Sequence, residues 1–234
     1  MIAIFKKEFR NYFMSPIGYI FIAIFTFLSS MFYCAGVLIN GQADISVMFS
    51  DVNFVYLFLT ALLTMRLLAE EKNKKTEQLL LSSPVSITGI VVGKYLAAMA
   101  VFCATVIISL IYPAIMFMYS EPALSEIISS YIGFILLWGA LISVGVFISS
   151  LTESQMIAGV FTFAALLLIY FISWFEQSVQ NEIVRTVIGW FSLLSRYSEF
   201  QSSMLNIGNV IYYLSFIFVF LFLTVRVIDK KRYS

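Results

Sequence analysis

The sequence contains no histidine among its 234 residues. This absence excludes zinc sites of the two-histidine type, Ser-His hydrolysis and general-base catalysis by histidine. The long apolar runs also have no Asp or Glu near their centres, where a proton relay or an ion-coupled carrier would need one. We therefore predict no catalytic residue and no metal ligand. An intramembrane enzyme is a disfavoured alternative.

Charged residues are scarce as well. They make up 12% of the chain, against 61% hydrophobic residues, and the mean hydropathy is +0.96. Soluble domains contain roughly 45–50% apolar residues, so a water-soluble fold is excluded. The net charge of +1 gives no overall field that would attract nucleic acid. We expect the lipid bilayer to cover this chain and no nucleic acid to bind it.

Two further kinds of site are missing. Cys34 and Cys103 both lie within apolar runs, where cysteine packs as a small side chain and neither a disulfide nor a metal site is expected. Residues 89–95 read GIVVGKY. Three residues separate the two glycines, and Tyr95 follows Lys94. A phosphate-binding loop needs four residues between its glycines and Ser or Thr after the lysine. We therefore expect no nucleotide or other cofactor in this subunit.

What the sequence does contain is a series of long apolar runs. A helix needs about 20 apolar residues to cross about 30 Å of hydrocarbon, and six runs are long enough: 17–39, 52–69, 95–119, 127–151, 156–175 and 209–228. The first is too long for the apolar core of a signal peptide. The sequence predicts an all-α integral membrane protein with six transmembrane helices in one domain over residues 1–234.

The distribution of Lys and Arg predicts the orientation of these spans. Cytoplasmic loops carry an excess of basic residues, and twelve of the fourteen fall on one side: Lys6, Lys7, Arg10, Arg66, Lys72, Lys74, Lys75, Lys94, Arg226, Lys230, Lys231 and Arg232. The loops around Asp44 and Glu121 have none. We expect both termini and the loop 70–94 to be cytoplasmic.

Residues 1–15 predict an amphipathic helix before the first span. Its apolar face carries Ile2, Phe5, Phe9, Tyr12 and Phe13, and its polar face carries Lys6, Lys7, Arg10 and Asn11. Such a helix lies at the membrane surface. Ser15 and Pro16 then suit the N-cap and first position of a new helix, which predicts a sharp elbow. A simple basic anchor is the alternative.

The loop 70–94 is charged in its first half and apolar in its second. A helix around 76–82 should stop before Pro84, because the residue before a proline disfavours helical geometry. A new helix beginning at Pro84 is expected to continue into the third span. Three consecutive leucines, Leu79, Leu80 and Leu81, have no reason to be exposed on a cytoplasmic loop. They predict a docking element for a soluble partner.

The segment 176–208 precedes the last span and is amphipathic. The apolar residues at helical spacing are Val184, Val187, Ile188, Phe191 and Leu194, and Gly189 interrupts the pattern. The segment is too short to cross the bilayer and too apolar to be fully solvated. It predicts an outer re-entrant hairpin. A helix packed on the outer ends of its neighbours is equally consistent with the pattern.

Several short motifs together resemble a known family. They are KEF at 7–9, SPIGY at 15–19, MRLLAEEK at 65–72, TEQLLL at 76–81, SPVS at 83–86, GKYL at 93–96 and SSLTESQ at 149–155. In this order the chain resembles permease subunits of the ABC-2 class of ATP-binding-cassette transporters. The similarity is greatest to the gliding-motility and nitrous-oxide-reductase-accessory branch. Similar permeases usually have Gly just before Thr76, where this chain has Lys75.

The resemblance implies contacts with a separate ABC ATPase subunit that binds ATP and Mg. The implied coupling residues are Glu70, Glu71, Lys72, Thr76, Glu77, Leu79, Leu80, Leu81 and Pro84, and those of the elbow helix are Lys6, Lys7, Glu8, Phe9 and Arg10. It also implies a dimer with a second permease copy or paralogue, an extracellular auxiliary subunit, the bacterial inner membrane and an export function. The substrate class stays open between a lipid, a glycan carrier, a peptide and a drug. A membrane scaffold of a surface or secretion apparatus is the alternative function.

Overall fold

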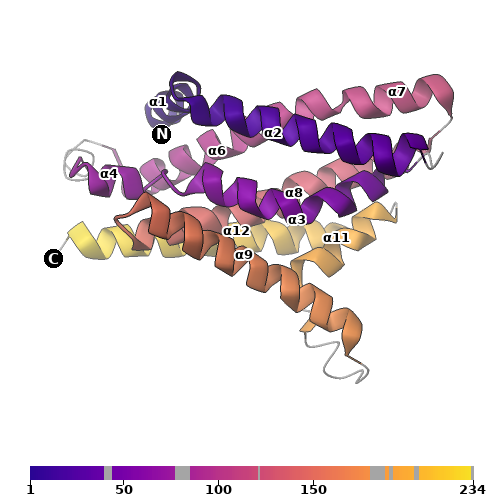
Figure 1. The fold of residues 1–234 in the computed structure, drawn as a ribbon. Coiled ribbons are helices and arrows are strands. Elements are labelled where there is room, and N and C mark those ends of the chain that lie inside the picture. The colour runs from indigo at the N-terminus through magenta and orange to yellow at the C-terminus, as the bar shows by residue number, and fades with distance from the viewer. Residues whose placement is uncertain are drawn as a thin grey trace.

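The computed structural model describes residues 1–39, 44–76, 85–120, 122–179, 188–189, 192–202 and 206–232. Within these ranges the regular elements are all helical. They are α1 (Ile2–Met14), α2 (Pro16–Tyr33), the π-helical segment Cys34–Ile39, α3 (Ile45–Thr64), α4 (Ala69–Asn73), α6 (Ile87–Ser109), α7 (Ile111–Tyr119), α8 (Leu124–Leu151), α9 (Gln155–Ser178), α11 (Leu193–Gln201) and α12 (Ile207–Arg232). The long helices form one bundle (Figure 1).

Six segments in the described part of the chain are long and apolar enough to cross a membrane. They are Pro16–Ile39, Val52–Asn73, Ile87–Tyr119, Leu124–Leu151, Gln155–Glu176 and Ile207–Lys230. This confirms the predicted fold class, an all-α multi-pass membrane protein. Both termini and α4 lie at the same end of the bundle (Figure 1), as an even number of crossings requires.

A sharp corner separates α1 from α2. α1 is seen nearly along its axis while the long helices run across the view (Figure 1). Ser15 is extended, and Pro16 occupies the start of α2, as the sequence predicts. The corner also depends on Gly18, because a Cβ there would lie 2.6 Å from the carbonyl oxygen of Tyr12. The position of α1 at a bilayer surface stays a prediction.

The third span contains a break between α6 and α7. Pro113 has no N–H to donate to the carbonyl of Ser109, four residues earlier, and its ring disfavours a straight helix. The Tyr131 hydroxyl of α8 donates to that Ser109 oxygen instead, at 2.9 Å. The carbonyl released by the proline therefore has a partner, which also ties α8 to the break.

The start of α6 differs from the sequence-based expectation. The new helix was expected to begin at Pro84, but Val85 and Ser86 are not helical and α6 begins at Ile87. The Ser86 side chain accepts a hydrogen bond from the backbone N–H of Gly89 at 3.2 Å. Ser86 thus caps an otherwise unpaired N–H of the first turn. Pro84 itself lies outside the described residues.

An aromatic core lies where α2, α3, α6 and α8 meet. Phe25 stacks on Tyr56 with ring centroids 4.3 Å apart, and Phe102, Phe134 and Trp138 complete a set of rings that are each 2% exposed or less. α8 is the central helix, since 72% of its span is buried, against 22% for that of α9 and 17% for that of α12. The last two therefore turn most of their surface outward, toward lipid or a second subunit.

At the far end of the bundle, α11 packs against α8 and α9. Ser129 of α8 donates to the carbonyl of Phe200 at 2.7 Å, and the Tyr213 hydroxyl of α12 donates to the carbonyl of Leu193 at 2.6 Å. These contacts favour a helix packed on its neighbours for residues 193–201. Residues 180–187 and 190–191 lie outside the described ranges, so the re-entrant hairpin stays a prediction.

Candidate functional site

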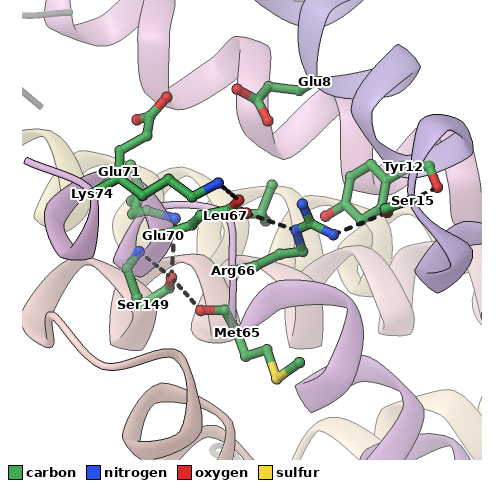
Figure 2. A network of polar contacts seen from close by, with 12 residues as sticks. Glu8, Tyr12, Ser15, Met65, Arg66, Leu67, Glu70, Glu71, Lys74 and Ser149 are labelled. Atoms are coloured by element: carbon green, nitrogen blue, oxygen red, sulfur yellow. Dashed lines mark hydrogen bonds and ion pairs between the residues drawn. The ribbon is translucent and has the colours of Figure 1, made fainter. Parts of the chain in front are cut away.

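The polar network at the α4 end of the bundle begins with the segment 65–68, which joins α3 to α4. The Ser149 hydroxyl of α8 accepts hydrogen bonds from the N–H groups of Leu68 and Ala69, both at 3.1 Å. It donates to the carbonyl of Met65 at 3.2 Å, and Figure 2 shows Ser149 beside Met65. A hydroxyl has one donor and two acceptor positions, and all three are used here. Ser149 therefore fixes the start of α4 on α8.

The end of α1 is attached to the same segment. The Tyr12 hydroxyl donates to the carbonyl of Leu63 at 2.7 Å. Burial raises the pKa of this hydroxyl, with a smaller contribution from Glu8, so it stays protonated and remains a donor. Arg66 reaches between Ser15 and Glu70 (Figure 2), with Nη1 3.0 Å from Ser15 Oγ and Nε 2.9 Å from Glu70 Oε2. The corner between α1 and α2 is thus held against the α3–α4 junction.

Lys94 of α6 is the centre of this network, and its side chain is 1% exposed. Its ammonium lies 3.2 Å from Glu8 Oε1 and 3.0 Å from Glu71 Oε1. It also donates to the carbonyl of Leu67 at 2.6 Å. A buried charge is costly unless it is paired, and three acceptors match the three donors of an ammonium group. Glu8, Leu67 and Glu71 come from α1, the α3–α4 junction and α4, so one side chain joins three segments to α6.

Lys7 adds a second, weaker bridge between the same carboxylates. Its ammonium lies 3.4 Å from Glu71 and 3.7 Å from Glu8, and its side chain is 54% exposed. Exposed ion pairs contribute about 0–1 kcal/mol, so Lys7 adds little to stability. With Lys94 it balances two carboxylates with two cations. The cluster of Lys7, Glu8, Glu71 and Lys94 is called the Lys94 cluster below.

The end of α4 has the hydrogen-bond pattern of a Schellman motif. The Thr76 N–H donates to the Glu71 carbonyl at 2.9 Å and the Lys75 N–H to the Lys72 carbonyl at 3.0 Å. Lys75 occupies the left-handed region with φ of 55°. Glycine is the usual residue at this position of the motif because a Cβ is strained there. Lys75 is therefore the left-handed residue of the motif.

The structure brings together part of the predicted site. Glu70, Glu71, Lys72 and Thr76 lie in or beside α4, and Lys7 and Glu8 of α1 are joined to Glu71 in the Lys94 cluster. Lys72 is buried and its ammonium donates to the carbonyl of Ser150, which favours an internal holding role. Lys6 and Arg10 are exposed and Phe9 is half-buried. Glu77, Leu79, Leu80, Leu81 and Pro84 lie outside the described residues.

Sequence reasoning missed three residues of this network. Lys94 was read as a marker of orientation, although a lysine beside an apolar run is itself a signal of a functional or paired site. Ser149 and Tyr12 were noted as part of a motif and of an apolar face. Nothing in the spacing indicates that their hydroxyls bond to the α3–α4 junction. The arrangement holds segments in position and contains no nucleophile paired with a base.

Comparison with known proteins identifies a family. The family model described as ABC-2 family transporter protein matches residues 2–229, nearly the whole chain. None of the curated proteins matches it. The matched range includes every residue of the Lys94 cluster and all six candidate spans.

Proposed function

The chain belongs to the ABC-2 family of transporter proteins, and from this membership we propose that it is an exporting permease driven by a separate cytosolic ATPase. The permease role and an ABC ATPase partner follow from the family in general. The finer proposal is that ATP, with Mg, is hydrolysed in that partner, and that the chain pairs with a second copy or a paralogue. An extracellular auxiliary subunit is a further proposed partner.

The observation that carries this proposal is the ion pair between α4 and α6, the helices that come before and after residues 77–84 in the sequence. Glu71 of α4 pairs with Lys94 of α6. Glu8 brings α1 into the same cluster. A partner that displaces the segment 77–84 would therefore move α1, α4 and α6 together. A bistable helix interface biased by such a docked element can change access to a pathway without any catalytic residue.

The docking contact itself is assigned to the leucines of that segment. Burying a leucine side chain is worth roughly 1.5–3 kcal/mol, whereas exposed charges at a rim give about 0–1 kcal/mol. We expect Leu79, Leu80 and Leu81 to supply affinity for the ATPase and Glu77 to supply orientation. Lys72 is buried against Ser150 and is assigned to holding α4 in place.

The test is Leu80→Asp in the permease reconstituted with its ATPase in nanodiscs. We expect ATPase association to fall by at least tenfold, since the lost burial of about 1.5–3 kcal/mol exceeds the 1.4 kcal/mol that corresponds to tenfold. Leu124→Asp is the matched control, because Leu124 begins α8 at the opposite end and is 61% exposed. Wild-type association and wild-type ATP-dependent transport by the Leu80 variant would refute the docking assignment. Association without any ATP-driven transport in the wild-type complex would favour the scaffold.

The proposed orientation places both termini and the segment 70–86 in the cytoplasm of a bacterial cell, beneath its inner membrane. The test uses a variant that lacks Cys34 and Cys103 and carries one new cysteine, in place of either Asn73 or Ala123. Both positions are exposed, and the proposed topology places them on opposite sides of the membrane. A membrane-impermeant maleimide on intact cells should label the cysteine at position 123 and spare that at 73 until the cells are opened. The reverse pattern would invert the topology.

A further inference from the structure

A groove of about 620 Å³ lies between α1, α6, α8 and α12. Its wall on α6 is formed by Tyr95, Met99 and Cys103, and α8 contributes Gly139. Ile217 of α12 faces them across the groove. The volume is in the range of ligand sites, roughly 300–1,000 Å³. The lining side chains are almost all apolar, so the ligand has an apolar body.

The groove wall carries no side chain at Gly139. A Cβ there would lie 3.1 Å from the Tyr95 hydroxyl and 3.3 Å from Ile217 Cδ1, so a larger residue would crowd this part of the wall. The Tyr95 hydroxyl donates to the carbonyl of Gly139 at 3.2 Å. This bond uses the hydroxyl proton, so neither group has a donor left for a ligand. With the apolar side chains around it, this part of the wall suits a hydrocarbon chain.

Part of the groove lining is exposed at the surface of the bundle. Ile2, Leu96 and Leu214 belong to it and are 67%, 37% and 54% exposed. Along α6 the groove runs from Tyr95 to Cys103, about 12 Å at 1.5 Å per residue. One leaflet is half of about 30 Å of hydrocarbon. The groove thus begins beside the polar end of the bundle, next to Lys94, and extends over most of the depth of one leaflet.

Basic side chains follow the part of α1 that lines the groove. Ile2 is a lining residue, and Lys6 and Arg10 come about one and two helical turns after it. Lys6 and Arg10 are exposed and form no ion pair within the described ranges, whereas Lys7 of the same helix pairs with Glu8 and Glu71. Their charges are therefore available to an anionic group at the surface of the bilayer.

We propose that this groove binds one acyl chain of an anionic phospholipid from the adjoining leaflet, with the lipid phosphate held against Lys6 and Arg10. The occupant lies along α6 from Tyr95 to Cys103 and enters past Leu214. This lipid site does not depend on the ATPase or on transport. Its test contains neither, so its failure would leave the proposed function untouched.

The first experiment uses the unmodified protein in nanodiscs with phosphatidylglycerol that carries a photoreactive diazirine on its acyl chain. We expect the main labelled peptide to contain residues 99–103. Lys6→Gln and Arg10→Gln should each lower this labelling about fivefold at subsaturating probe, as expected for one basic residue near a membrane surface. Lys75→Gln, also exposed and basic, is the control and should change nothing. Equal labelling of α6 and α9, unaffected by Lys6 and Arg10, would overturn the site.

The second experiment fills the groove. Ala100 lines it, and Ala104 lies one turn further along α6 outside the set of lining residues. Ala100→Phe should abolish labelling at 99–103, and Ala104→Phe should retain it. Retention in both would refute the site. A second copy of the chain is the rival occupant, and efficient bis-maleimide cross-linking between the Cys103 residues of two copies would establish it and overturn the proposal. If Ala100→Phe does not fold, the Lys6 and Arg10 variants decide.

Discussion

The two ends of the bundle each fasten a short helix to the long ones, but they use different chemistry. At one end α1 is held by the Lys94 cluster, in which a fully buried ammonium contacts two carboxylates. At the other end Ser129 and Tyr213 donate to backbone carbonyls of α11. Two carboxylates there accept from neutral groups, Glu176 from Ser195 and Glu199 from Asn209. Arg196 of α11 stacks on Tyr212 at 4.1 Å and donates to Asn209 at 3.1 Å, so even its charge meets neutral groups.

This difference in chemistry predicts at which end of the bundle the movement of one helix is transmitted to others. Removing a partner from a buried charge is costly, whereas a neutral hydrogen bond has a net worth of about 0.5–1.5 kcal/mol. The Lys94 cluster also joins residues far apart in the sequence, since Glu8 and Lys94 are 86 positions apart. α1, α4 and α6 are therefore coupled strongly, while α11 can shift on α8 at smaller cost.

The largest expected effect on stability comes from replacing both carboxylates that pair with Lys94. Glu8→Gln combined with Glu71→Gln leaves its charge buried with the Leu67 carbonyl as an acceptor. We expect a loss of about 3–5 kcal/mol in the free energy of unfolding, measured by denaturant unfolding in detergent micelles. Adding Lys94→Met should recover most of this loss, because a buried ion pair can be replaced by neutral residues at little cost.

The matched change at the other end is Glu199→Gln, which alters an exposed carboxylate that accepts from Asn209 at 2.7 Å. Its expected cost is below about 1 kcal/mol. Similar losses at both ends, or no recovery with Lys94→Met, would show that burial of the Lys94 charge does not distinguish the two ends.

The six spans could be predicted from the sequence, whereas the polar contacts that distinguish the two ends of the bundle could not. Six spans are evident because each is a local run of apolar residues of sufficient length. The elbow break at Ser15 and Pro16 is also local, since proline and its cap act on neighbouring residues. The pairing of Lys94 with Glu8 depends on how α1 lies against α6, which no local pattern encodes.

The same reasoning explains the errors at element boundaries. The helix that leads into the third span was expected to begin at Pro84, whereas Ser86 caps a helix that begins at Ile87. The outer segment was predicted as a re-entrant hairpin or a packed helix with equal support. Contacts from Ser129 and Tyr213 favour packing for α11, and those contacts are again tertiary.

A smaller effect compares one serine at each end. Ser149→Ala leaves the N–H groups of Leu68 and Ala69 without their acceptor, and buried unsatisfied groups cost about 1–3 kcal/mol. We expect a loss of about 2–3 kcal/mol in the free energy of unfolding. Ser129→Ala removes one donor to the Phe200 carbonyl and should cost about 1 kcal/mol.

Hydrogen exchange separates the two serine variants further. Ser149→Ala should increase exchange across 65–73, because α4 loses its anchor on α8, and Ser129→Ala should increase exchange within α11. An equal loss of stability in the two variants, with exchange unchanged at both sites, would contradict the assigned anchoring roles.

The smallest expected effect is a gain in stability at the end of α4. Lys75 is a non-glycine residue with φ of 55°, and the left-handed conformation costs a residue with a Cβ about 1–2 kcal/mol. Lys75→Gly removes that strain but adds freedom to the unfolded chain, which offsets part of the gain. We expect a net stabilisation of about 0.5–1 kcal/mol in the same unfolding assay. Lys75→Ala removes the same charge and keeps the Cβ, so it should give no gain and isolates the backbone contribution.

Lys74 adopts an ordinary helical φ of −80° and pairs with Glu70 at 2.7 Å, so Lys74→Gly should destabilise the protein. If Lys75→Gly and Lys75→Ala had the same stability, backbone strain would not be the reason that glycine suits this position, and the end of α4 would be fixed by its charges alone.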